Sequence, residues 1–270
     1  MSKIPVTENP TPDNLISPIQ CVCECIGVFA LCYFGGMAVI QSEMGNLGLT
    51  GVAIEHGLVI AFFIHSVFKI TGGHLNPAVT LGLFISRHCG WKKMLGYWAS
   101  QLTGSLLAGI LLKLYVAQMQ YPPLVSRLGY PHANLHVNKA GICFIMEAVG
   151  TYFLLFIIYM CAVNRTRTQY LHGSAIGAYI TICIIGIGPM TGCAINPCRM
   201  LGPAIISGEL FEYDYRYAYI YYIGDFVGGA LMGLTWKCLF AHHHDAEKDA
   251  KYDLESIMTR QEESYKNGLV

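Results

Sequence analysis

Long apolar segments are the feature that most constrains the fold of this chain. A helix needs about 20 mainly apolar residues to cross the hydrocarbon core of a bilayer. Six segments meet this need, at residues 18–40, 51–69, 94–117, 140–162, 172–189 and 217–240. With 54% hydrophobic and only 13% charged residues, the chain is also too apolar for an ordinary soluble domain. The sequence therefore predicts an all-α membrane protein whose main partner is lipid.

Two shorter apolar segments lie between these spans. NPAVTLGLFIS begins at Asn76, between the second and third spans, and NPCRMLGPAII begins at Asn196, between the fifth and sixth. Each has about ten residues, and at 1.5 Å per residue that is only half of a crossing. Because Asn is a preferred N-cap and Pro is favoured at the first helical position, the two Asn-Pro pairs predict the starts of two half-helices.

The two halves of the chain repeat one another. ECIGVFAL from Glu24 aligns with EAVGTYFL from Glu147, and Gln101 corresponds to Asp225, each three residues before a glycine. Three spans and one half-span per half make an odd number of crossings, so the second half should be inverted relative to the first. The half-helices then enter from opposite faces and meet near the midplane, where broken helices are tolerated if they line a cavity or are buried in protein. One Asn-Pro alone could simply start a helix in a loop, but two at matching places favour a pore.

The two half-helix starts predict the chemistry of such a pore. Their positive dipole ends and Asn amides would point at the middle of the pathway, where N–H groups donate to water and the dipoles oppose cations and a proton-conducting water chain. The extended segments before them have carbonyls without helical partners, which can accept hydrogen bonds from water. We expect these pore-loop carbonyls to belong to Gly72, Gly73, His74, Gly192 and Ala194.

GGHLNPAVTLG and TGCAINPCRMLGPA resemble the paired signature motifs of the aquaporin (major intrinsic protein) family, and the resemblance extends from Glu24 to about Gly233. It implies six tilted helices plus two half-helices, in a homotetramer with one pore in each subunit. It also implies passage of water and small neutral solutes. The pore midplane motifs that it implies are Asn76, Pro77, Ala78, Asn196, Pro197 and Cys198. Cys198 departs from the usual Ala, which leaves pore width and proton exclusion open.

The resemblance also implies an outer constriction, the selectivity filter, at His56, Ile184, Cys193 and Arg199. This set is similar to that of plant tonoplast intrinsic proteins and of ammonia-permeable animal aquaporins, so we expect water and ammonia as permeants. A glycerol- or urea-permeable aquaglyceroporin is the alternative within the family. Glycerol-conducting members have Asp directly after the filter Arg, whereas this chain has Met200, and glycerol therefore ranks below water and ammonia.

The acidic residues inside the spans include Glu24, Glu147 and Asp225, and an isolated charge there would be costly. The resemblance implies that Glu24 and Glu147 accept hydrogen bonds from the pore-loop backbones, and a proton relay is the alternative for this pair. Asp225 stands where the family usually has Pro or another uncharged residue, and its role stays open.

The charge distribution predicts the domain organisation and the topology. We expect an N-terminal segment at 1–16, a channel domain at 17–240 with repeats at about 17–120 and 138–240, and a polar tail at 241–270. Lys and Arg concentrate on the side that holds both termini, which should be cytoplasmic in a plasma, vacuolar or other intracellular membrane. The sequon at Asn164 would then lie in a cytosolic loop and carry no glycan. No cleaved signal peptide is expected.

Other functions are less consistent with the sequence. Most of the eleven cysteines lie in apolar segments and are expected to be free thiols, and we expect no metal, no cofactor and, with a net charge of +0, no nucleic-acid partner. A secondary transporter also uses inverted repeats and broken helices, but would need a coupling-ion site. A closed structural or adhesion protein is a further alternative. An enzyme is the least expected, because no nucleophile, base and orienting group occur together.

Overall fold

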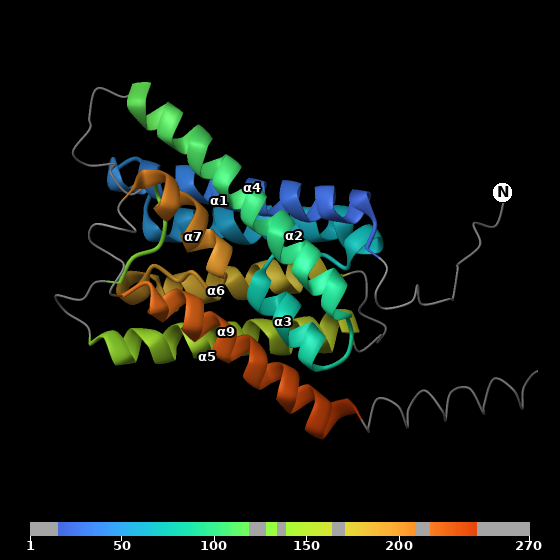
Figure 1. The fold of residues 1–270 in the computed structure, drawn as a ribbon. Coiled ribbons are helices and arrows are strands. Elements are labelled where there is room, and N and C mark those ends of the chain that lie inside the picture. Colours follow the sequence, from blue (N-terminus) through green and yellow to red (C-terminus); the bar gives the residue numbers. More distant parts are fainter. Residues whose placement is uncertain (1–15, 119–127, 134–138, 164–170, 209–216, 242–270) are drawn as a thin grey trace, which may run out of the picture.

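The computed structural model describes residues 16–118, 128–133, 139–163, 171–208 and 217–241. Over these residues every regular element is a helix, and the helices form one bundle (Figure 1). The long helices of the described part are α1 (Pro18–Glu43), α2 (Leu49–Thr71), α4 (Trp91–Gln118), α5 (Ala140–Ile158), α6 (His172–Thr191) and α9 (Tyr219–Thr235). Short π-helical segments continue two of them, η2 (Tyr159–Val163) after α5 and η4 (Trp236–Phe240) after α9.

The length and apolarity of these helices fit a membrane. Five helical spans among the described residues are long and apolar enough to cross a bilayer: α1, α2, α4, α6, and α5 together with η2. The sixth, α9, has only 17 residues, but η4 continues it to Phe240. The predicted all-α membrane fold with six long helices and two half-helices is therefore confirmed.

Several helices extend further than the apolar segments that predicted them. Helix α1 continues to Glu43 and α4 begins at Trp91, each about one turn beyond the predicted span. Hydropathy identifies only the part of a helix that lies in the hydrocarbon core. Backbone hydrogen bonds continue the helix beyond that part, into the polar interface of the membrane. At its start α1 is fixed by a capping box, in which the Ser17 hydroxyl accepts from the Ile19 N–H and the Gln20 side chain accepts from the Ser17 N–H.

The two half-helices are α3 (Pro77–Ile85) and α7 (Pro197–Ser207). Each begins at an Asn-Pro pair, with the Asn side-chain oxygen accepting from the N–H two residues on, at 2.8 Å for Asn76 and 3.1 Å for Asn196. Figure 1 shows α3 and α7 entering the bundle from opposite ends and converging in its middle. Their starts contact one another there.

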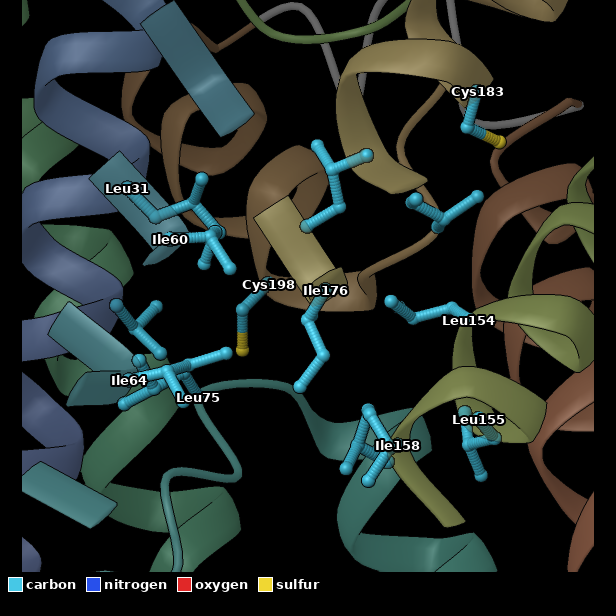
Figure 2. Close-up of a cluster of buried hydrophobic side chains, with 14 of the residues drawn as sticks. Leu31, Ile60, Ile64, Leu75, Leu154, Leu155, Ile158, Ile176, Cys183 and Cys198 are labelled. Atoms are coloured by element: carbon cyan, nitrogen blue, oxygen red, sulfur yellow. The ribbon is translucent and has the colours of Figure 1, made fainter. Parts of the chain in front are cut away.

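The packing repeats between the two halves. Helix α1 packs against α4 in the first half as α5 packs against α9 in the second, and α2 packs against α6 across the join. Each half-helix also crosses to the other half, since α3 lies against α9 and α7 against α4. The apolar core lies around the half-helix starts. In Figure 2, Ile60 and Ile64 of α2 lie on one side of this core, and Leu154 and Ile158 of α5 lie on the other side.

Some predictions concern residues outside the described part of the chain. These are the polar N-terminal segment up to residue 15, the sequon at Asn164 and the tail from residue 242.

Candidate functional site

The starts of the two half-helices are joined by a reciprocal pair of hydrogen bonds. The Asn76 Nδ2 donates to the Ile195 carbonyl at 2.7 Å, and the Asn196 Nδ2 donates to the Leu75 carbonyl at 2.9 Å. Each Asn oxygen already caps its own helix. Because an amide nitrogen carries two hydrogens, each Asn has one further N–H to offer. Both side chains line the same cavity, so these N–H groups have a space to donate into.

The loop before each half-helix has an unusual backbone. Gly72 and Gly192 end α2 and α6 in the left-handed conformation, with φ of 88° and 82°. Leu75 and Ile195, directly before the Asn residues, also have positive φ, at 48° and 41°. Positive φ is costly for a bulky or β-branched residue, so other contacts must hold these loops in place.

Two buried carboxylates supply those contacts. Glu24 accepts from the N–H groups of His74 at 3.0 Å and Leu75 at 2.7 Å. Glu147 accepts from the N–H groups of Ala194 at 3.2 Å and Ile195 at 2.8 Å. Both glutamates have no solvent-exposed surface. Each glutamate therefore binds the N–H groups of the two residues before its Asn, and the Leu75 and Ile195 carbonyls accept from the opposite Asn instead.

Two further pairs of residues hold the loops, and the sequence reasoning missed them. Thr71 and Thr191 accept from the loop N–H groups two residues on, at 2.8 and 3.0 Å. Tyr97 and Tyr221 donate to the backbone carbonyls of Thr71 and Thr191, at 2.8 and 2.7 Å. The internal repeat carries the signal, because each Thr stands five residues before its Asn and each Tyr four residues before Gln101 or Asp225.

One cavity extends from the loop before α3, past the starts of both half-helices, to the predicted filter. Its polar or loop-backbone lining comes from Gly73, His74, Leu75, Asn76, Cys193, Ala194, Ile195, Asn196, His56 and Arg199. The apolar part of its wall includes Leu31, Ile60, Ile64, Leu154, Ile158, Ile176, Ile180 and Ile184. Gly73, His74 and Ala194 thus face this cavity, whereas Gly72 and Gly192 serve as the C-caps of α2 and α6.

The four predicted filter residues are brought together at one end of the cavity. His56, Ile184, Cys193 and Arg199 are each at most 5% exposed. The His56 Nδ1 lies 2.8 Å from the Val52 carbonyl and 3.2 Å from the Glu55 Oε2, and since both are acceptors this nitrogen carries the proton. The opposite nitrogen, Nε2, then accepts from Arg199 Nε at 3.2 Å and Nη2 at 3.1 Å.

Arg199 has a second partner and a donor to spare. Its Nη2 also donates to the Gly129 carbonyl at 2.8 Å, which anchors the guanidinium to the segment between α4 and α5. Its Nη1 is buried and makes no hydrogen bond to any described residue. Arg199, which lines the cavity, thus keeps one N–H donor for which the described residues supply no acceptor.

A family model described as major intrinsic protein matches residues 15–236 of this chain. The chain belongs to that family. Major intrinsic proteins are membrane channels, not enzymes, and this chain is an integral membrane protein of the aquaporin type.

Individual aquaporins are similar over most of the chain. It is 33% identical to Aquaporin NIP1-1 of Oryza sativa subsp. japonica over 76% of this chain and 67% of that protein. It is 34% identical to Aquaporin TIP4-4 of Zea mays over 72% of this chain and 73% of that protein. The X-ray structure of the aquaglyceroporin from Plasmodium falciparum has the same fold, with a TM-score of 0.75 and 23% identity over 85% of this chain and all (100%) of that chain.

One residue of this aquaporin departs from the family motif. Cys198, where Ala is usual, is 2% exposed and packs in the core beside the α7 start, as Figure 2 shows, whereas Ala78 holds the matching place on α3. The Cys198 carbonyl accepts from the Ser105 hydroxyl of α4, and the same hydroxyl accepts from the Gly202 N–H at 3.1 Å. Ser105 therefore holds the first turn of α7 in position.

No metal site is formed in the described part of this aquaporin. No group of three or more His, Cys, Asp or Glu residues there could hold a metal ion. The eleven cysteines all lie among the described residues, and none of them forms a disulfide.

Proposed function

We propose that this aquaporin is a passive channel for water and for small neutral solutes such as ammonia, and that it excludes protons and ions. The observation that carries the proposal is the cavity between Asn76 and Asn196. Both Asn side chains retain an N–H toward it, and both half-helix dipoles direct their positive ends at it. A water molecule that accepts from both amides has both lone pairs occupied, so it cannot accept a proton from a neighbouring water, and the proton-conducting chain is interrupted.

The filter geometry supports water and ammonia as permeants. The Arg199 and His56 side chains are hydrogen-bonded across the end of the cavity, so a passing molecule must replace that bond. Water and ammonia can do so, because each accepts from the guanidinium and donates to the neutral His56 Nε2. Ile184 contributes an apolar part of the wall, and its side chain has no polar group that could hydrogen-bond a larger polyol.

The glycerol alternative finds less support at the next position along α7. Met200 is 1% exposed and packs in an apolar cluster, with its sulfur 3.1 Å from the Tyr222 hydroxyl. It supplies no carboxylate near the filter. The Plasmodium falciparum protein is an aquaglyceroporin, but at 23% identity its likeness to this chain is one of fold alone.

The four pairs of residues that hold the pore loops act as structural braces rather than as a proton relay. These are the Glu, Thr and Tyr pairs and the amides of Asn76 and Asn196.

We expect both termini on the cytoplasmic side of a plasma or intracellular membrane, and a homotetramer with one pore in each subunit. Glycosylation at Asn164 would contradict this topology.

Stopped-flow measurements on reconstituted vesicles test the solute preference. Osmotic shrinkage, ammonia entry and glycerol entry are compared for the wild type and for His56→Phe with Ile184→His. Since the double change removes the neutral acceptor from α2 and adds a polar ring on α6, we expect water flux to persist within about threefold and ammonia flux to fall about tenfold. An unchanged ratio of ammonia to water flux would refute the filter assignment. Saturable flux that requires an ion gradient would favour a transporter.

A further inference from the structure

The two repeats differ at the group that supports each loop-binding glutamate. In the first half, the Gln101 Nε2 donates to the Glu24 Oε2 at 2.8 Å. In the second half, the matching residue on α9 is Asp225, and its carboxyl lies within hydrogen-bonding reach of the Glu147 carboxyl. An amide donor in one half is thus replaced by a second acid in the other.

The Asp225 and Glu147 side chains are fully enclosed, each with 0% exposed surface. Helix α9 approaches α5 closely here, since a Cβ built on Gly224 would lie 3.6 Å from the Glu147 Cβ. Within the described residues, no lysine or arginine nitrogen lies within 4.0 Å of either carboxyl. Two ionised carboxylates in contact, away from water and without a cation, would repel strongly, so the pair must retain a proton.

The hydrogen bonds around the two carboxyls indicate that the shared proton is on Asp225 rather than on Glu147. Both oxygens of Glu147 already accept from backbone, one from Ala194 and one from Ile195, which suits a carboxylate. The Asp225 Oδ1 accepts from the Thr151 hydroxyl at 3.4 Å, whereas its buried Oδ2 receives no hydrogen bond from any described donor. A protonated Oδ2 would itself be the donor and would leave no orphaned oxygen.

We propose that Asp225 is a positioning residue held as the neutral carboxylic acid, whose O–H donates to Glu147 and does for the second pore loop what the Gln101 amide does for the first. The proton stays on Asp225, and the charge stays on Glu147, where two loop N–H groups stabilise it. The pair thereby fixes the backbone that presents Ala194 and Asn196 to the cavity.

The other titratable groups around the pair do not replace this proton donor. The Cys193 thiol, in the loop before α7, lies near both acids, the Cys183 thiol of α6 lies near Asp225, and the Cys143 thiol of α5 lies near Glu147. The Tyr221 hydroxyl of α9 is already donating to the Thr191 carbonyl. The Thr191 hydroxyl also lies within hydrogen-bonding reach of Glu147, as the Thr71 hydroxyl does of Glu24, so Asp225 is the group of the second half that takes the place of Gln101.

Infrared difference spectroscopy of the reconstituted full-length protein tests the protonation directly. We expect the wild type to show the carbonyl-stretch band of a buried carboxylic acid, and Asp225→Asn to lack it while keeping water permeability, because the Asn amide can donate in the same direction. The matched change in the first half, Gln101→Glu, should add a second such band. A wild-type band that persists in Asp225→Asn, or no band in the wild type, would overturn the inference.

Permeability separates the roles of the two acids. Asp225→Leu, which has no donor, and Glu147→Gln, which loses an acceptor for a loop N–H, should each lower water flux per folded channel about tenfold. Full flux in Glu147→Gln would show that Glu147, and not Asp225, is the neutral partner. This inference relies on the proposed channel only for the flux readout, since the infrared band reports protonation whatever solute permeates.

Discussion

Arg199 shows at the scale of one residue how this protein accommodates a cation at membrane depth. It is 3% exposed, and it donates to His56 and to the Gly129 carbonyl, which compensates for the water that its guanidinium has lost. No described carboxylate forms an ion pair with it. Its positive charge is therefore not neutralised by a direct ion pair with a described residue, which is what exclusion of cations requires.

Cys193 is the thiol that faces the cavity at the filter. It lines the same cavity as Arg199, whereas Cys198 packs in the core beside the α7 start. We expect mercurials to abolish most of the water flux of the wild type, because a metal on the Cys193 sulfur would obstruct the filter. Stopped-flow shrinkage should show that Cys193→Ser is spared and that Cys198→Ser remains inhibited. Equal inhibition of the wild type and Cys193→Ser would reject Cys193 as the target.

Single residues also show what the sequence could predict of the site. The sequence motifs predicted the roles of Asn76, Asn196 and Arg199. The two Asn residues cap the helices that they precede, and Arg199 follows Asn196 by three residues in the same motif. The hydrogen bond between Arg199 and His56 joins α7 to α2, and no local pattern encodes such a partner. The Tyr97 and Tyr221 hydroxyls also have acceptors in other elements of the fold, and in the sequence their signal is the matching place of the two tyrosines in the internal repeat.

Among the elements, the two half-helices depend on glycines at their contacts with full-length helices. Helix α3 lies against α9, where a Cβ built on Gly229 would be 3.1 Å from the Ala78 carbonyl carbon and would collide with its oxygen. The backbones of α3 and α9 thus touch at the first turn of α3. This contact sets how far α3 reaches toward the midplane.

Gly229→Val should displace α3, because the added side chain meets backbone rather than a flexible side chain. We expect a loss of about 3 kcal/mol in the free energy of unfolding, measured by denaturant titration in detergent, with loss of water flux. Gly186→Val on α6 is the matched control, since a Cβ there has no neighbour within 4 Å. The control should change stability by only about 0.5 kcal/mol. Equal effects of the two substitutions would contradict the packing account.

The existence of the elements was predictable, but their ends were less so. Six apolar segments and two Asn-Pro starts follow from what a bilayer and a helix N-terminus require. The π-helical segments that continue α5 and α9 were not predicted, because an i to i+5 hydrogen bond leaves no trace in apolar periodicity.

At the scale of the whole molecule, the inverted repeat explains why the pore has matching groups from both sides. The Glu, Thr and Tyr pairs bind the two loops through corresponding hydrogen bonds, and the two Asn residues bond reciprocally. The repeat departs from symmetry at the filter, where His56 and Arg199 are placed at one end only, and at Gln101 against Asp225. Sequence repetition therefore predicted the architecture, whereas the departures carry the features specific to this channel.

Osmotic water flux and proton flux, measured together in vesicles that contain the purified protein, test the central claim most directly. We expect water permeability well above that of protein-free vesicles, with a low activation energy, linear dependence on the osmotic gradient and no added proton leak. Water flux equal to that of empty vesicles from a correctly folded protein, or proton flux that rises together with water flux, would contradict the claim.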